Sequence, residues 1–282
     1  MRNDEKANRT LREWLGTERL LGNTHIASAA AEAETQPFSS AEARPDPDPP
    51  DERAPQAPAL PEQGPQQVHP ELPALCDHEL PVDQAQQRLA ALDAEFVKDC
   101  TRCGLCNGRK QTVFGIGLSR PEIVFVGEGP GADEDAQGIP FVGRAGQLLS
   151  RMIAAMTLTR DQVYICNIVK CRPPGNRTPT EEEMRACLPF LRRQLAILRP
   201  KVIVTLGRPA TQCLLDTQAP IGRLRGRFHD FPPPSLESWG VHPARLMPTY
   251  HPAYLLRSPG EKKKSWDDLQ QVMRFLGLSI PG

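Results

Sequence analysis

Four short apolar runs divide the C-terminal two thirds of the chain, and each is expected to form a strand: residues 122–127, 163–167, 201–206 and 245–250. Residues 144–156 are amphipathic at helical spacing, and Thr180 with Glu183 forms the capping box of a second helix. Strands that alternate with helices predict an α/β fold with a central, mostly parallel four-stranded sheet flanked by helices. Ligands bind beyond the carboxyl ends of such strands, where the loops after Gly127, Asn167 and Tyr250 lie.

The first third of the chain has a different pattern. Residues 1–26 hold one short helical pattern (residues 10–21), which is marginal alone and therefore either docks on a yet unknown protein partner or forms a loose, partly ordered tail. Residues 27–81 are rich in Ala, Pro, Glu, Gln and Asp, and we predict a disordered linker there. A helix over residues 82–98 then opens the folded domain, which we place at residues 82–282.

Charge separates these two parts. Residues 1–99 contain 9 Lys and Arg against 19 Asp and Glu, whereas residues 100–282 contain 25 against 15. A basic body fits a polyanionic partner such as nucleic acid. No run of about 18 apolar residues and no secretory signal is found, so we expect a cytoplasmic monomer without membrane contact.

Cysteines supply the first candidate site. Cys100 and Cys103 form a CxxC pair, Cys106 follows closely, and Cys171 and Cys187 come much later. Four thiolates from two distant segments hold zinc or an iron–sulfur cluster, and the spacing does not choose between them. A redox CxxC is the competing interpretation, but no strand precedes Cys100 as such motifs require.

A glycine-rich segment, GEGPGADED (residues 127–135), directly follows the first strand. We reject a dinucleotide fingerprint, because Pro130 lacks an N–H and no helix is expected before about Arg144. The carboxylates of Glu128, Glu134 and Asp135 are the candidate functional groups here. The alternative is that they are solvated loop acids.

Two side chains near the same sheet edge fit a planar ligand. Phe141 lies in a glycine-flanked loop and can stack on a ring, although core packing is an equal alternative. Asn167 ends the second strand, and its amide carries the donor and acceptor needed to contact the edge of a base. Capping of a local turn is the ordinary role of such an Asn.

The segment HPAYLLRSP (residues 251–259) carries the last candidates. Pro252 fits the first position of a helix, which places His251 at its positive end, where a neutral imidazole donates to developing negative charge. We expect Leu255, Leu256 and Arg257 on an exposed loop, where an apolar wedge beside a cation suits stacked DNA.

Together these stretches resemble the family 4 uracil-DNA glycosylases, the iron–sulfur type. The matching stretches are CTRC, VGEGPGADED, GIPFVGRAGQLL, YICNIVKCRPPGNRTP, Cys187 and YHPAYLLR, in the order of the family. The resemblance implies a 4Fe–4S cluster on Cys100, Cys103, Cys171 and Cys187, and leaves Cys106 outside the set.

The resemblance also implies roles in excising uracil from single- or double-stranded DNA. By this resemblance, Glu128 and Gly129 form the first active-site motif, and Glu134 or Asp135 lies near the sugar. Phe141 stacks on uracil, Asn167 contacts the edge of the base, and His251 contacts its O2. The wedge of Leu255, Leu256 and Arg257 enters the duplex, while the arginine-rich loop after Cys171, with Arg172 and Arg177, binds DNA. Gly129 occupies the position where family 1 enzymes carry a water-activating Asp.

Two other functions remain open at this point. One is a catalytically silent iron–sulfur module that binds nucleic acid. The other is a glycosylase that also removes other deaminated bases, which the polar Asn167 and the packed Phe141 disfavour because a larger base needs a roomier pocket.

Overall fold

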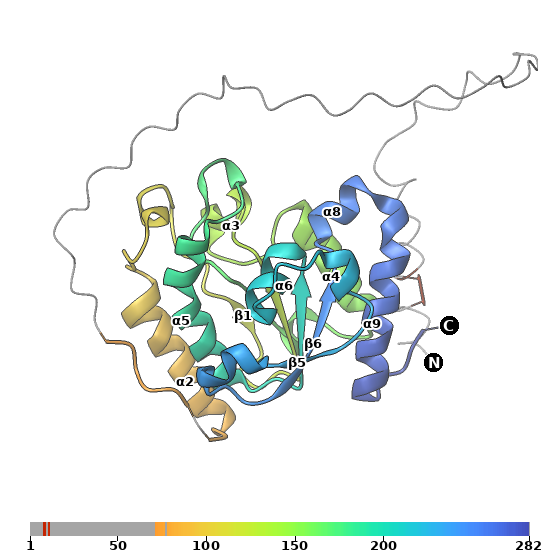
Figure 1. Ribbon diagram of the computed structural model, residues 1–282, viewed down its shortest axis with the longest axis horizontal. Coiled ribbons are helices and arrows are strands. Elements are labelled where there is room, and N and C mark those ends of the chain that lie inside the picture. Colours follow the sequence, from red (N-terminus) through yellow and green to blue (C-terminus); the bar gives the residue numbers. More distant parts are fainter. Residues whose placement is uncertain (1–7, 10, 12–70, 77, 282) are drawn as a thin grey trace, which may run out of the picture.

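A six-stranded sheet forms the centre of the molecule (Figure 1). The computed structural model describes residues 8, 9, 11, 71–76 and 78–281. The strands are β1 (Ile116–Gly117), β2 (Ile123–Gly127), β3 (Tyr164–Asn167), β4 (Val202–Leu206), β5 (His229–Phe231) and β6 (Ala244–Thr249), in the spatial order β1-β3-β2-β4-β6-β5. The four central strands are parallel, and both edge strands are antiparallel.

The four predicted strands are confirmed as the parallel centre of this sheet. All residues of β2, β3 and β4 are buried, as strands covered on both faces require. The prediction omitted β1 and β5, which contain two and three residues and carry no apolar run long enough to indicate a strand.

Helices cover both faces of the sheet, and each face has its own core (Figure 1). Val124 and Val126 of β2 pack on the side of α2 (Val82–Leu92), α5 (Glu181–Leu198) and α6 (Arg208–Leu215). Ile123 and Phe125 point to the side of α4 (Arg144–Ala155), α8 (Pro252–Arg257) and α9 (Lys262–Leu276). This alternation follows from the two-residue period of a strand. No helix among the described residues is long and apolar enough to cross a bilayer.

The folded body begins earlier than residue 82. Cys76 and Leu80 are buried in the core beside α2, and the Arg193 side chain donates to the carbonyl of Pro73. The C-terminal end of the predicted linker is therefore packed on the domain, while residues 27–70 lie outside the described part of the chain. The same holds for most of residues 1–26, of which Leu11 is described and is buried with α4 and α9.

A short helix, α3 (Ala132–Gln137), begins inside the glycine-rich segment of residues 127–135. The expectation that no helix starts before about Arg144 is therefore wrong. Gly131 is its N-terminal cap, and the Glu134 side chain accepts a hydrogen bond from the Gly131 amide at 3.0 Å. Three acidic residues in the first turn favour this start, because they lie at the positive end of the helix.

Candidate active site

A cavity of about 570 Å³ opens beyond the carboxyl ends of β2, β3 and β6. It lies at the sheet edge that the strand pattern predicted for ligand binding. The predicted residues that it brings together are Glu128, Gly129, Glu134, Phe141, Asn167, Arg177, His251 and Arg257. Asp135, Arg172, Leu255 and Leu256 do not line it.

The side chains of Phe141, Asn167 and His251, from three separate segments, meet in this cavity. The ring centroids of Phe141 and His251 lie 5.7 Å apart. A Cβ atom built on Gly127, the last residue of β2, would lie 2.4 Å from Oδ1 of Asn167 and 2.6 Å from the Phe141 ring. Only a glycine at this strand end therefore leaves room for both the Asn167 and the Phe141 side chains beside the β2 backbone.

The His251 imidazole has a defined tautomer. His251 caps the N-terminus of α8, and its Nδ1 accepts a hydrogen bond from the Ala253 amide at 3.1 Å. Burial, together with the positive charge of Arg257, lowers the pKa of His251 to about 4. The ring is therefore neutral at pH 7, and because Nδ1 is an acceptor, Nε2 carries the proton and acts as a donor.

Asn167 presents an unpaired acceptor. The side chain is 1% exposed, and its Oδ1 has no hydrogen-bond partner among the described residues. An unsatisfied buried amide oxygen costs free energy unless a ligand supplies a donor. The cavity is therefore suited to a planar group with an N–H along one edge.

Glu128 and Gly129 follow β2 at the cavity wall. Burial raises the pKa of the Glu128 carboxyl, against the opposing effects of a hydrogen bond with Thr178 and of the Arg208 charge. A Cβ on Gly129 would lie 2.7 Å from the Val169 side chain, so the glycine brings the loops after β2 and β3 together.

The two acids of α3 that the sequence singled out, Glu134 and Asp135, lie in different surroundings. Glu134 lines the cavity, and its Oε1 accepts from the amides of Val142 and Gly143 at 2.9 and 3.0 Å. Asp135 is 1% exposed, and its carboxylate accepts from the Lys110 amide at 2.9 Å. The structure therefore separates the pair: only Glu134 reaches the site, and the placement of Asp135 near a substrate is wrong.

The segment after His251 is helical rather than an exposed loop. Leu255 is completely buried in the core with α4 and α9, so its expected place in an exposed wedge is wrong, whereas Leu256 is half-buried against the same core. The exposed positions of α8 are Tyr254 and Arg257, which both line the cavity. Their three-residue spacing places them on one helix face.

The loop after Cys171 forms the opposite rim. Arg177 is exposed at the cavity and forms a bidentate ion pair with Glu183, whereas Arg172 donates to Oδ1 of Asn176 at 2.8 Å. Asn176 and Arg144 line the cavity as well and were missed. Gly175 and Asn176 both have positive φ, and a Gly-Asn pair is the sequence signal that could have predicted this turn.

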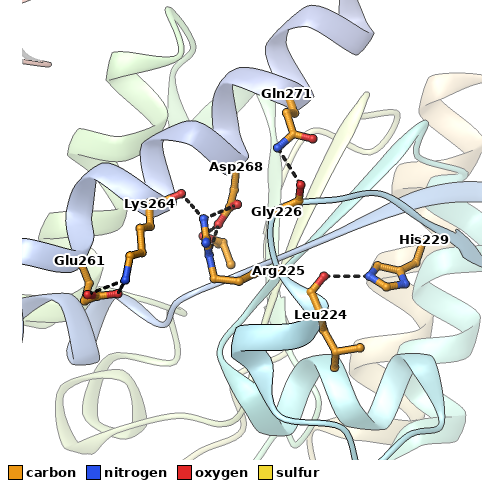
Figure 2. A network of polar contacts seen from close by, with 9 residues as sticks. Leu224, Arg225, Gly226, His229, Glu261, Lys264, Asp268 and Gln271 are labelled. Atoms are coloured by element: carbon orange, nitrogen blue, oxygen red, sulfur yellow. Dashed lines mark hydrogen bonds and ion pairs between the residues drawn. The ribbon is translucent and has the colours of Figure 1, made fainter.

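A polar network joins Asp268 and Gln271 of α9 to the loop that contains Arg225 and Gly226 (Figure 2). Asp268 of α9 accepts from Thr249, the last residue of β6, at 2.8 Å and from the Arg225 guanidinium at 2.6 and 3.0 Å. Burial raises the pKa of Asp268 to about 6. Gln271, on the same helix, donates to the Gly226 carbonyl. The network therefore ties α9 to the hydroxyl of Thr249, two residues before His251.

The cysteines lie around a second, small cavity between the start of the domain and α5. Cys100, Cys103, Cys106, Cys171 and Cys187 all line it. The Lys170 amide donates to Sγ of Cys187 and the Arg109 side chain to Sγ of Cys171, both at 3.3 Å. Burial raises the pKa of Cys187 to about 12 and of Cys171 to about 11.

This cavity brings the predicted cluster ligands together. No group of three or more His, Cys, Asp or Glu side chains in the described part of the chain has the spacing needed for a single metal ion. Cys100, Cys103, Cys171 and Cys187 nevertheless all line the one cavity, and four thiols are the donor set of an iron–sulfur cluster. N–H donors to sulfur are also the environment such clusters use.

Comparisons with known proteins agree with this geometry. The sequence profile described as Uracil DNA glycosylase superfamily matches residues 114–270. A Type-4 uracil-DNA glycosylase of Saccharolobus solfataricus is 42% identical over 192 residues, which cover 66% of this chain and 85% of the relative. The chain is a member of the type-4 family of this superfamily.

The matches to two further type-4 relatives cover nearly the whole length of each relative. The Type-4 uracil-DNA glycosylase of Thermotoga maritima is 41% identical over 194 residues, which make up 68% of this chain and 96% of the relative. That of Archaeoglobus fulgidus is 41% identical over 189 residues, 66% of this chain and 92% of the relative. The matched superfamily region contains the cavity residues from Glu128 to Arg257, whereas Cys100 and Cys103 precede it.

Proposed function

We propose that this chain is a uracil-DNA glycosylase that hydrolyses the bond between uracil and deoxyribose and leaves an abasic site. The observation that carries the proposal is the unpaired Oδ1 of Asn167, buried in a cavity whose other walls are the Phe141 ring and the His251 imidazole. Membership of the type-4 family supports it.

Uracil fits these three groups edge by edge. Its N3–H would donate to Oδ1 of Asn167, and the Asn167 amide nitrogen would donate to O4. The ring would stack on Phe141, and O2 would accept from Nε2–H of His251. A base within a duplex is out of reach, so the nucleotide has to be flipped out, at a cost of a few kcal/mol.

Bond cleavage separates charge. The C1′–N1 bond breaks with its electron pair going to N1, so the leaving uracil is an anion and the sugar becomes cationic. The neutral His251 donor would stabilise the anion at O2, and a preorganised donor of this kind contributes about 3–4 kcal/mol. The Glu134 carboxylate, fixed by backbone amides, would stabilise the cationic sugar.

Water completes the reaction at C1′. We assign the water to Glu128, which stands beside Gly129 at the cavity wall. Burial raises the pKa of the Glu128 carboxyl, which makes it a better proton acceptor than a fully solvated carboxylate. The water oxygen bonds to C1′, its proton passes to Glu128, and the carboxyl then releases the proton to solvent.

The rim provides the DNA contacts. Arg144, Arg177 and Arg257 are exposed around the cavity and would meet phosphates, and Arg172 lies in the same loop as Arg177. Tyr254, rather than Leu255 or Leu256, presents an exposed ring beside Arg257 for stacking on a neighbouring base.

A 4Fe–4S cluster would be held by Cys100, Cys103, Cys171 and Cys187. When bound, it would order the arginine-containing loop between Cys171 and Cys187, which has few apolar residues of its own. All eight cysteines are unpaired thiols, which fits a reducing compartment such as the cytoplasm. We propose that the protein acts there as a monomer.

The function is tested with labelled single-stranded oligonucleotides that carry uracil, hypoxanthine or thymine at one position. Alkali-sensitive sites should form in the uracil strand only. Cleavage of the hypoxanthine strand at a similar rate would show a wider base range. Binding of all three without any abasic product would show a catalytically silent nucleic-acid-binding module.

A further inference from the structure

Arg160 is a half-buried arginine that does not line the active-site cavity but contacts the segment that carries Phe141. It lies in a short 3₁₀ turn (Arg160–Gln162) just before β3. Nη2 donates to the Pro140 carbonyl at 2.8 Å, and Nη1 donates to the Phe141 carbonyl at 3.1 Å and to the Ser150 hydroxyl at 3.3 Å.

Phe141 needs such support because its backbone is strained. Its φ is +55°, a left-handed conformation that a residue with a Cβ adopts only when its surroundings hold it there. The following amides, of Val142 and Gly143, donate to Glu134. The segment is therefore held through its carbonyls by Arg160 and through its amides by Glu134.

The packing on α4 leaves this segment little room. A Cβ on Gly146 would lie 1.8 Å from the Phe141 carbonyl oxygen, so the helix backbone passes directly against it. The position of that oxygen, which Arg160 binds, thus sets how far the Phe141 ring extends toward His251 and Gly127.

We propose that Arg160 is a positioning residue that holds the Phe141 ring at the position where it stacks on the flipped base. This inference rests on the proposed function. The planar guanidinium spans two successive carbonyls, which a single ammonium does not do in the same way, so lysine should replace it only in part. A ring displaced by about 1 Å from its productive position costs as much as 100-fold in rate.

The test compares single-turnover uracil release by the wild type, Arg160→Met, Phe141→Ala and the double variant, at saturating enzyme on one single-stranded oligonucleotide. We expect Arg160→Met to lower the rate about 10- to 100-fold, with Arg160→Lys in between. In the Phe141→Ala background the same change should have less than a threefold effect. Circular dichroism and the melting temperature report whether each variant is folded.

The matched control is Arg151→Met, which removes the charge of a half-buried arginine of α4 that lines neither cavity. It should release uracil within twofold of the wild type. An equal loss from Arg160→Met in the wild-type and the Phe141→Ala backgrounds, or a loss matched by Arg151→Met, would overturn the positioning role. A wild type that releases no uracil would instead overturn the proposed function on which it rests.

Discussion

The rings of Phe141 and His251 face one cavity with their centroids 5.7 Å apart and their planes inclined by 36°. One ring comes from the loop before α4 and the other from the cap of α8, more than a hundred residues later in the chain. Their meeting beside the buried amide of Asn167 defines a slot for a planar base, and the predictions below test the contribution of each wall.

Asn167→Asp should lower uracil release by about 100-fold or more. The carboxylate would face O4 of uracil, where the amide nitrogen donates in the wild type, and buried unpaired acceptors are costly. Gln147→Glu, the same chemical change on the exposed side of α4, is the control and should leave the rate unchanged. If Asn167→Asp retains the wild-type rate, Asn167 only caps the end of β3.

Gly127→Ala should close the slot without adding charge. The new methyl group would lie within 2.6 Å of both Oδ1 of Asn167 and the Phe141 ring, so one of the two has to move. We expect at least a tenfold loss of rate in single-turnover assays. Gly222→Ala, where a Cβ meets nothing within 4 Å, should have no effect on the rate.

His251→Ala should lower the single-turnover rate about 100- to 1000-fold, because one preorganised donor to the leaving group is lost. His242→Ala, an exposed histidine outside the cavity, serves as the control. Folding of both variants is checked by circular dichroism. A wild-type rate in His251→Ala would exclude the leaving-group role.

The pH dependence of the rate of uracil release should show no inflection near pH 6.5, where an ordinary histidine ionises. The pKa of His251 is lowered to about 4, so the ring is neutral on both sides of its ordinary pKa. The depressed pKa also links to stability: the contribution of the neutral ring is complete above pH 6.5 and is lost as pH falls through about 4. The ¹⁵N chemical shifts of the His251 imidazole in the free protein should therefore titrate near pH 4. A midpoint near pH 6.5 would contradict the buried environment of this ring.

Cysteine variants test the cluster. Purified wild type should be brown and contain iron and sulfide, and Cys187→Ser should lose the visible absorbance because one of four thiolates is gone. Cys213→Ser, on α6 and outside the cysteine cavity, should keep the colour. A colourless wild-type protein that contains zinc would contradict the assignment.

The sequence predicted the parts of the fold that depend on strong local patterns. Apolar runs such as residues 202–206 identify buried strands, and the Thr180–Glu183 capping box identifies the start of α5, where the Glu183 amide donates to the Thr180 hydroxyl. Edge strands such as β5 were not predicted, because a strand of three residues of which only Phe231 is buried has no such pattern, and its pairing with β6 is a tertiary contact.

The residues of the candidate site also differ in how far the sequence could locate them. Residues at strand ends, such as Asn167, were placed correctly because parallel strands end at one sheet edge. Asp135 and Leu255 were misplaced because burial is decided by the direction of a helix face, which a six-residue helix such as α8 does not reveal by periodicity. The contacts of Arg160 could not be predicted from the sequence, because its partners are backbone carbonyls some twenty residues away.

The most direct measurement is a mass-spectrometric count of the products formed from one uracil-containing single strand at excess enzyme. Free uracil and abasic strand should appear in equal amounts with the wild type and fall together, at least 100-fold in rate, with Asn167→Asp. An oligonucleotide that is bound but recovered intact, with its uracil still attached, would contradict the account.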